Sequence, residues 1–510
     1  MTASRRQIAR AAGLVSVLFA VSRLLGLVRE MVIGAQFGTS GTLDAYLAAF
    51  RLPDMIFYLV AGGALGSAFI PTFSATLTRE DDPRHLAAWR LASSVSNLLL
   101  IVTTVLAIVA AVLALPLVRT LIAPGFAPEQ QVLTAQLMRI MLLAPIIFGL
   151  SGIIMGILNS FQHFLSPALA PVLYNLAIIL AAWFLVPALG VRGLAIGVVM
   201  GALAHLLVQV PALLRRKPLY FPTLGLSNPD VREVTRLMGP RVLGLAAVQI
   251  NFLISANLAS RLAPGSLSAL NYGWLMMLLP QGIVAQGIAT AIFPTLSALS
   301  ARGQIDQLRT TLNGALRALL WLTLPAAAGL LLLRVPLIQL LLQRGEFTAQ
   351  STAMTAYALA FFAFGLMAHS LLEVVTRGFY ALHDTKTPVA IGIGAMVLNL
   401  VFSLLLIRPL SYGGLALANT LATTIETLTL LWLIRPRLGG LGGRRLVGTL
   451  VRSLAATLAM AAAVVVYLNL AGDASPWLLV GGGILLGGLV YALFAFVFGR
   501  QELRSLVRAR

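Results

Sequence analysis

Apolar residues fill this chain in long stretches that short polar segments separate. A helix of about 20 apolar residues crosses the hydrocarbon core of a bilayer, so each stretch predicts a membrane-spanning helix. Counting from the start predicts about 14 spans, at residues 12–35, 43–72, 91–117, 134–158, 168–187, 193–214, 239–260, 267–294, 313–333, 353–376, 389–407, 413–434, 453–471 and 477–498. The pattern predicts an all-α polytopic membrane protein.

Composition supports this class and argues against others. The 510 residues are 59% hydrophobic and 10% charged, with a mean hydropathy of +0.94, whereas about a quarter of the residues in soluble domains are charged. Cysteine is absent, so we expect no disulfide framework, thiolate metal site or thiol nucleophile. The five histidines are scattered, and neither HExxH, GxxxxGK[ST] nor GxGxxG after a strand occurs. We therefore predict a protein that is not an enzyme, needs no cofactor and does not drive transport with ATP by itself.

The net charge of +20 is distributed unevenly between alternate loops. With the N-terminus inside, cytoplasmic segments hold about 26 of the 36 Lys and Arg residues and external loops about 6. The densest basic segments, 215–217, 435–445 and 500–510, suit a topology signal and attraction to anionic lipid, so no nucleic-acid partner is implied. The basic start lacks a convincing cleavage site, so we expect a retained first helix. Both termini are predicted to be cytoplasmic.

The chain contains an internal repeat. AFIPTFSATL at 68–77 matches AIFPTLSALS at 291–300, APGFAPEQ at 123–130 matches QRGEFTAQ at 343–350 more weakly, and FQHFLSP at 161–167 resembles FYALHDTKTP at 379–388. These pairs join spans six helices apart, which predicts two parallel repeats around an axis along the membrane normal. We expect an N-lobe (1–217), a C-lobe (218–437), and two further spans with a basic tail (438–510). A substrate cleft between the lobes, opened by rocking, follows from this architecture.

Charged residues interrupt the first predicted span. Arg23, Gly26 and Glu30 fall on one face of a helix, and Arg29 adjoins Glu30. A charge at the centre of a membrane helix costs at least roughly 2.5–3.5 kcal/mol, so such residues usually face a bundle interior or a water-filled cavity. We therefore regard these residues as candidates for a transport path.

The second predicted span carries a similar set. Asp44, Arg51 and Asp54 share one helical face, and Pro53 predicts a kink, because proline removes a backbone donor. Kinked helices at membrane depth are typical of transporter substrate sites. The positive and negative charges of the two spans nearly cancel. The alternative to a transport path is therefore that these residues form ion pairs that hold the two helices together.

The C-lobe offers a different polarity. Glu373 stands four residues before Arg377, and Glu426 lies in a later span. Oxygen ligands on two helical faces could hold a sodium ion; these residues are Asn399, Ser403, Asn419 and Thr423. Hydrogen bonds between helices are the commoner use of such side chains, so both interpretations stay open.

Five segments of the chain form a recognisable set of motifs. They are SRLLGLVREMVIGAQFG, DAYLAAFRLPD, GALGSAFIPTFS, APGF at 123–126 and TPVAIGIGAMVLNL. Together these motifs resemble the MurJ (MviN) family of lipid II flippases. The resemblance implies a member of the multidrug/oligosaccharidyl-lipid/polysaccharide exporter superfamily, with fourteen helices in two lobes plus two. It also implies transfer of the lipid-linked peptidoglycan precursor from the inner to the outer leaflet of a bacterial inner membrane, for cell-wall biogenesis and cell shape.

The resemblance assigns roles to four of the charged residues. Arg23, Arg29, Asp44 and Arg51 match polar positions that line the family's central cavity, where arginines meet the diphosphate of the lipid. A planar guanidinium suits this role, because it binds phosphate oxygens bidentately and stays charged. Glu30 and Asp54 complete our expected substrate-binding set.

The sequence departs from the family pattern at four positions. Phe57 and Gly62 replace an arginine and a glutamate after the RLP motif, and Leu275 replaces an arginine in the C-lobe, with Leu278 where acids would stand nearby. A flippase for another polyprenyl-diphosphate glycan, an ion-coupled exporter of small amphiphiles and a non-transporting scaffold therefore remain as alternatives. For transport, we expect an ion gradient or the membrane potential to supply the energy.

Overall fold

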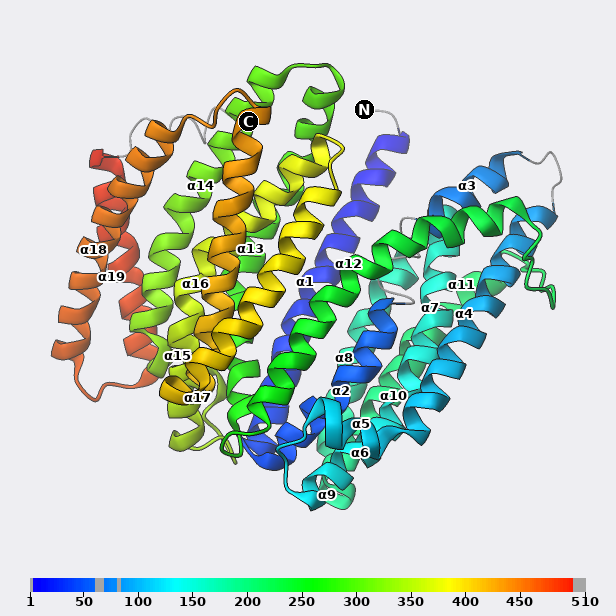
Figure 1. Cartoon of the computed structure of the whole chain (residues 1–510), viewed down its shortest axis with the longest axis horizontal. Helices are drawn as coiled ribbons and strands as arrows, with labels where there is room; N and C mark the ends of the chain where they lie inside the picture. Colours follow the sequence, from blue (N-terminus) through cyan, green and yellow to red (C-terminus); the bar gives the residue numbers. More distant parts are fainter. Residues whose placement is uncertain (1–2, 60–67, 80–83, 499–510) are drawn as a thin grey trace. The chain divides into compact units, whose positions relative to one another are not determined.

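The computed structural model describes residues 3–59, 68–79 and 84–498, without the side chains of 3–12, 79, 239–245, 247 and 498. Helices account for all regular secondary structure in these ranges (Figure 1). The first twelve α-helices and one π-helix are α1 (Ala3–Phe37), α2 (Gly41–Phe57), α3 (Ile70–Arg79), α4 (Leu86–Val112), α5 (Ala114–Leu117), η3 (Val118–Ile122), α6 (Pro128–Met141), α7 (Leu143–Ser160), α8 (Leu165–Phe184), α9 (Val186–Leu189), α10 (Val191–Leu207), α11 (Val210–Leu214) and α12 (Pro229–Ala259). The remaining helices are α13 (Ser266–Ala301), α14 (Ile305–Leu332), α15 (Arg334–Leu342), α16 (Ala349–Ala381), α17 (Lys386–Arg437), α18 (Gly443–Ala471) and α19 (Pro476–Phe498).

The predicted spans fall on these helices, except that residues 60–67 of the predicted span 43–72 lie outside the described residues. Spans 389–407 and 413–434 both lie in α17, which turns at Ser411. Among the described residues, ten helices are long and apolar enough to cross a membrane. The predicted first, second and seventh spans lie in α1, α2 and α12 and are not among the ten. Each of these helices carries charged residues, and the apolar part of α12, Val248–Ala259, is short. The all-α polytopic fold class is thus confirmed.

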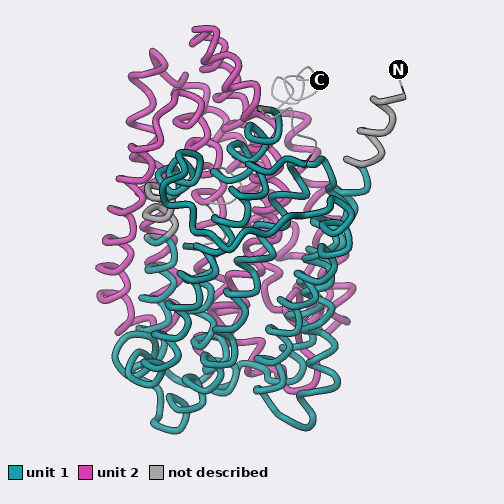
Figure 2. The backbone as a smooth tube through the Cα atoms, turned by 90° about the vertical axis from the view of Figure 1, so that its right-hand side faces the viewer, with its two compact units in different colours: residues 1–264 teal, residues 265–510 magenta. Residues whose placement is uncertain are grey.

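Compactness divides the chain at one point. Unit 1 comprises Met1–Pro264 and unit 2 comprises Gly265–Arg510 (Figure 2). Helix α12, which the repeat assigned to the C-lobe, therefore packs with unit 1, where it contacts α2, α4 and η3. The units are defined by contacts within the structure, whereas the predicted lobes are defined by the sequence repeat. The lobes 1–217, 218–437 and 438–510 therefore stay a prediction.

The APGF segment ties the end of α12 to unit 1. The backbone N–H of Gly125 donates to Ser260 Oγ at 3.1 Å, and Asn257 Nδ2 donates to the carbonyl of Leu121 at 2.7 Å. A Cβ at Gly125 would lie 2.6 Å from the Cα of Arg261 and from the carbonyl oxygen of Ser260. Only glycine allows this approach, because both neighbours are backbone atoms.

The repeat is visible in the backbone at a constant spacing of 221 residues. Gly190, between α9 and α10, has φ 58° and ψ −145°, and Ser411 has φ 51° and ψ −135°. Three residues later, a Cβ at Gly193 or at Gly414 would meet the backbone of the residue eight positions earlier, at 2.7 and 2.2 Å. The same tight turn therefore occurs in each unit.

A second pair of turns has the same spacing. Gln162 and His383 both have left-handed φ, at 57° and 58°. The next residue in each case, His163 or Asp384, donates its N–H to the carbonyl five residues earlier, at 2.8 and 3.0 Å. Both pairs of turns, Gln162 with His383 and Gly190 with Ser411, are thus 221 residues apart, so equivalent positions of the two units in this region differ by 221.

Replacing Ser411 by glycine is expected to stabilise the protein. The backbone region of Ser411 is essentially restricted to glycine, and a side chain held there costs on the order of 1–3 kcal/mol. We expect Ser411→Gly to raise the Tm of the detergent-purified protein, by about 2–4 °C per kcal/mol for a unit of this size. Gly190→Ser, the equivalent change in unit 1, should lower it. A Tm that falls in Ser411→Gly would contradict this interpretation of the turn.

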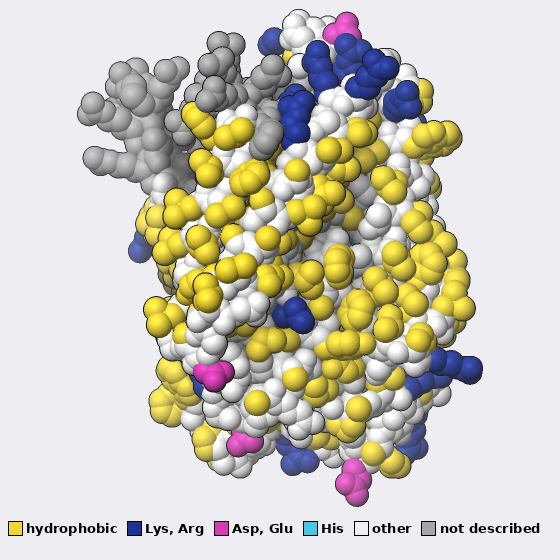
Figure 3. All heavy atoms as spheres, turned by 90° about the vertical axis from the view of Figure 1, so that its left-hand side faces the viewer, with side chains coloured by type: hydrophobic (Ala, Val, Ile, Leu, Met, Phe, Trp, Pro, Cys, Tyr) yellow, Lys and Arg dark blue, Asp and Glu magenta, His cyan; other side chains and the backbone are white. Residues whose placement is uncertain are grey.

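The outer surface is apolar where spans would meet lipid. Hydrophobic side chains cover the middle of the face drawn in Figure 3, and Lys and Arg side chains gather toward its ends. On α19, Leu485, Leu489 and Leu493 are more than 60% exposed. Contiguous apolar surface of this extent is unfavourable in water and favourable against acyl chains.

Candidate substrate-binding site

Arg29 is the most extensively held of the predicted site residues. It lies on α1, which packs along α8. Its Nη2 and Nε donate to Glu30 Oε1 at 2.6 and 3.2 Å, and its Nη1 donates to Asn175 Oδ1 at 3.1 Å. Charge-assisted bonds of this kind fix the plane of the guanidinium. The Arg29 side chain is 25% exposed, so part of it remains accessible.

Asn175 on α8 belongs to this site and was missed by the sequence analysis. Its Nδ2 donates to the carbonyls of Ser22 and Pro171, at 3.2 and 3.1 Å, while its Oδ1 accepts from Arg29. A Cβ at Gly26 would lie 3.9 Å from Asn175 Nδ2, in ordinary contact. An amide within the apolar span 168–187 was the available signal, and only its contact with α1 shows its use.

Arg51 faces α12. Its Cζ lies 5.5 Å from the ring centroid of Phe252, a cation–π contact. Its Nε is buried and has no hydrogen-bond partner among the described residues. Because buried donors are nearly always satisfied, an unsatisfied nitrogen here is unusual and points to a role other than packing for Arg51.

Asp54 links the two arginines. Its carboxylate interacts electrostatically with Arg51, three residues earlier on α2, and with Arg29 on α1. With Glu30, these residues form one group of two cations and two anions. The structure therefore brings together four of the six residues in the predicted set, Arg29, Glu30, Arg51 and Asp54.

Arg23 and Asp44 lie at other depths of the same two helices. Arg23 is exposed and precedes Arg29 by six residues, roughly 9 Å along α1. Asp44 is 2% exposed and lies in the first turn of α2, roughly 10 Å along the axis from Arg51. A carboxylate is favourable at a helix N-terminus, which supplies a structural reason for Asp44.

Phe57 occupies its position as a packing residue. Its ring lies 5.2 Å from that of Phe148, which in turn lies 5.3 Å from Tyr174. Tyr174 and Tyr46 also lie near Arg29. An aromatic layer thus borders the charged group on the side where the family pattern would place an arginine. Gly62 lies outside the described residues.

The C-lobe residues predicted to hold an ion are mostly buried in unit 2. Asn399 and Ser403 lie in the first half of α17, and Asn419 and Thr423 in its second half. Asn419 Oδ1 is 3.1 Å from Nε2 of His369 on α16, so one predicted ligand oxygen already has a protein partner. Among the described residues, no group of three or more His, Cys, Asp or Glu is placed to hold a metal. The sodium site stays a prediction.

Leu275 and Leu278, which replace charged residues of the family pattern, are half-buried in α13.

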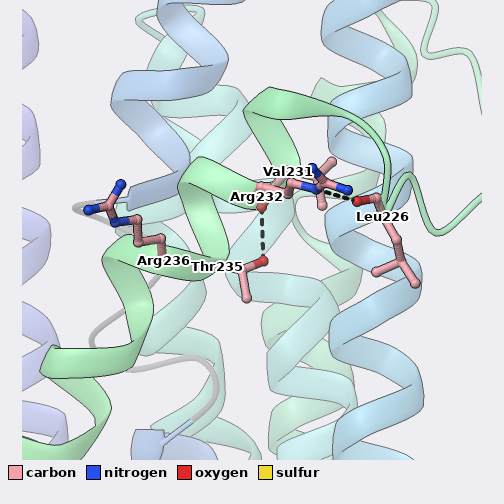
Figure 4. Close-up of a pocket in the computed structure, with 5 residues that line it drawn as sticks. All are labelled: Leu226, Val231, Arg232, Thr235 and Arg236. Carbon is pink, nitrogen blue, oxygen red and sulfur yellow. Dashed lines mark hydrogen bonds between the residues drawn. The ribbon is translucent and has the colours of Figure 1, made fainter.

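A pocket of about 340 Å³ lies at the start of α12, away from the predicted site residues (Figure 4). Arg232 Nε donates to the carbonyl of Leu226 at 2.9 Å, and the Thr235 hydroxyl donates to the carbonyl of Val231 at 2.9 Å. Arg236 points away from the other lining residues. Of the two arginines that line this pocket, Arg232 is hydrogen-bonded to the backbone and Arg236 points away. The charged residues around Arg29 and Arg51 are therefore the better candidate for the binding site.

Comparison of the sequence with known proteins identifies one family. The family model described as "Lipid II flippase MurJ" matches residues 33–479. The chain is 32% identical over 427 residues to "Lipid II flippase MurJ" of Burkholderia cenocepacia, covering 82% of each chain. It is 30% identical over 517 residues to "Probable lipid II flippase MurJ" of Bdellovibrio bacteriovorus, covering 99% of this chain and 97% of that one.

Comparison of the folds agrees. The structure titled "Lipid II flippase MurJ, inward closed conformation" matches with a TM-score of 0.82 and 27% identity, over 96% of this chain and 99% of that one. An inward-facing multidrug transporter of the MATE family matches with a TM-score of 0.66 and 16% identity, over 82% and 94%. The second likeness concerns the fold alone.

Proposed function

Because the chain belongs to the lipid II flippase MurJ family, we propose that it moves lipid II from the inner to the outer leaflet of the bacterial cytoplasmic membrane. This is transport without chemical conversion of the lipid. The observation that carries the proposal within the structure is the charged group of unit 1, in which Arg51 Nε is buried without a hydrogen-bond partner among the described residues and Arg29 is held in a fixed plane.

The chemistry of this group suits the diphosphate of the lipid. Glu30 and Asp54 balance the two arginines while no substrate is bound, which lowers the cost of burying four charges. A diphosphate presents several anionic oxygens, and arginine binds such oxygens bidentately. We infer that Arg29 and Arg51 bind the diphosphate, that Arg23 and Asp44 line the path on the same helices, and that lobe rocking gives alternating access.

Complementation tests the function. Expression of the chain should restore growth to a bacterium depleted of its own lipid II flippase. Purified protein in liposomes should also transfer lipid II between leaflets faster than undecaprenyl diphosphate carrying an unrelated glycan. Transfer of the unrelated glycan alone would favour the alternative substrate, which Phe57 and Leu275 leave open. Failure of both assays would remove the flippase function.

The orientation we propose places both termini in the cytoplasm, because basic loops alternate with nearly uncharged ones. The chain has no cysteine of its own, so single cysteines report cleanly. We expect a membrane-impermeant thiol reagent to leave cysteines beside Arg216 and Arg444 unlabelled in intact cells and to label one beside Arg261. Labelling of the first two from outside would contradict this topology.

We further propose that an ion gradient or the membrane potential supplies the energy, since the sequence carries no nucleotide-binding motif. Dissipating every gradient in the liposome assay should abolish accumulation of lipid II in one leaflet.

A further inference from the structure

Glu426 is a carboxylate in the middle of a membrane-spanning segment. It lies on the second half of α17, 15 residues after the turn at Ser411 and 11 before the helix ends at Arg437. These separations correspond to roughly 22 and 16 Å along the helix axis. Glu426 is therefore far from both ends of its helix, and its side chain is half-buried.

Within unit 2, Glu426 makes no hydrogen bond or ion pair to the residues that the structure describes. The helices packed against α17 are α16 and α13. On α16, Arg377 is bound to Glu373 at 2.6 Å, and His369 lies 3.1 Å from Asn419. The other ionisable side chains of these helices and of the adjoining core are Tyr357, Tyr380, Tyr272, Arg317, which donates to Thr449, and, at the ends of the two halves of α17, Lys386, Arg408, Tyr412, Arg435 and Arg437. Among the described residues of unit 2, no cation forms an ion pair with Glu426.

The repeat supplies an internal comparison. At a spacing of 221, Glu426 corresponds to His205 on α10 of unit 1. There, Ser151 Oγ lies 2.7 Å from His205 Nδ1 and accepts from Gln209 Nε2 at 2.8 Å. The positions equivalent to Ser151 and Gln209 in unit 2 are leucines, Leu372 and Leu430. The same place in the repeat thus holds a satisfied ionisable group in one unit and an unsatisfied one in the other.

The facing half of α17 places a glycine against the carboxyl group. A Cβ at Gly392 would lie 3.3 Å from Glu426 Oε1, tighter than an ordinary contact. The carboxyl group therefore occupies space that a side chain at position 392 would fill, and Gly392 brings no side-chain charge or hydrogen-bonding group to it.

An unpaired carboxylate at this depth is expensive, and a proton removes the cost. Side chains of this kind usually mark ion or proton pathways in membrane proteins. We propose that Glu426 is a proton-binding site that couples transport to a proton gradient, an inference that rests on the proposed function.

The coupling step is one protonation. The Glu426 carboxylate takes up a proton from water on the outer side and becomes a neutral acid, which the apolar surroundings favour. Rearrangement of the lobes then exposes it to the inner side, where it releases the proton. Inward proton movement returns the empty carrier, so that lipid II leaves toward the outer leaflet.

The transport test uses the full-length protein in liposomes that contain lipid II, with an imposed pH difference and the membrane potential clamped. With one proton per cycle, each unit of pH difference changes the steady-state ratio of lipid II between leaflets by about tenfold. Glu426→Gln, which mimics the neutral acid, should keep lipid II exchange without a gradient and lose this dependence. Glu426→Asp should retain it. His205→Gln, at the equivalent position of unit 1, is the matched control and should also retain it.

A second measurement needs no substrate. The infrared carbonyl band of a protonated carboxyl group should appear in the reconstituted wild-type protein as pH falls and be absent in Glu426→Gln. Wild-type transport that ignores the pH difference, or follows a sodium difference at constant pH, would overturn the proposal, as would an unchanged pH response or unchanged band in Glu426→Gln. If the wild type moves no lipid II under any gradient, the proposed function fails, and the band alone then decides whether Glu426 binds a proton.

Discussion

Arg29→Lys is expected to abolish most lipid II transport while the protein folds and reaches the membrane at normal abundance. The guanidinium of Arg29 bonds Glu30 and Asn175 simultaneously through three nitrogens, and an ammonium cannot reproduce this fork. A hydrogen bond to a charged group contributes about 1.5–3 kcal/mol. Because a loss of 1.4 kcal/mol in binding free energy corresponds to a tenfold change in the equilibrium constant, we expect the transport rate to fall by roughly 10- to 100-fold. Complementation and liposome transfer at matched abundance measure the loss.

Unit 2 provides a matched control for this substitution. Arg377 bonds Glu373 at 2.6 Å, the same distance as the bond from Arg29 to Glu30, and both arginine side chains are 25% exposed. Arg377→Lys should therefore disturb a comparable ion pair and leave transport largely intact. If Arg29→Lys and Arg377→Lys lose transport to the same extent, in proportion to their decrease in Tm, the arginines act as ion pairs that hold helices together. Normal growth with Arg23, Arg29 and Arg51 all replaced by alanine would eliminate the diphosphate site.

Gly125→Ala is expected to destabilise unit 1 although it adds one methyl group. That methyl would lie 2.6 Å from backbone atoms of Ser260 and Arg261, and these cannot rotate away as a side chain would. Forcing extra atoms into a packed contact costs typically about 1–3 kcal/mol. The hydrogen bonds that tie α12 to the APGF segment would lengthen as well. We expect lower Tm, lower membrane abundance and loss of complementation.

Gly314→Ala on α14 is the control for Gly125→Ala. A Cβ at Gly314 meets nothing within 4 Å, and alanine favours a helix over glycine by roughly 1 kcal/mol. This variant should keep or raise the Tm. A Gly125→Ala protein as stable as the wild type would show that the APGF segment can move away from α12 at little cost.

Much of the fold followed from local pattern. Apolar stretches long enough to cross a bilayer predicted positions that the helices occupy, because span length and hydropathy are properties of a single segment. The repeat was also visible in short motifs, and the turns at Gly190 and Ser411 show it again in the backbone. Charged residues in apolar spans identified the candidate site, since their cost at membrane depth does not depend on their partners.

Tertiary structure decided the partners. Asn175 lies 146 residues from Arg29, and no periodicity within either helix predicts their hydrogen bond. The end of α12 is held within unit 1 by the hydrogen bond from Gly125 to Ser260, two residues that lie 135 positions apart in the chain. Glu426 was one polar residue among several in the sequence, and its lack of a partner became visible only when Arg377 was found bound to Glu373. Helix formation depends on neighbours in the chain, whereas the satisfaction of a buried charge depends on which helices pack together.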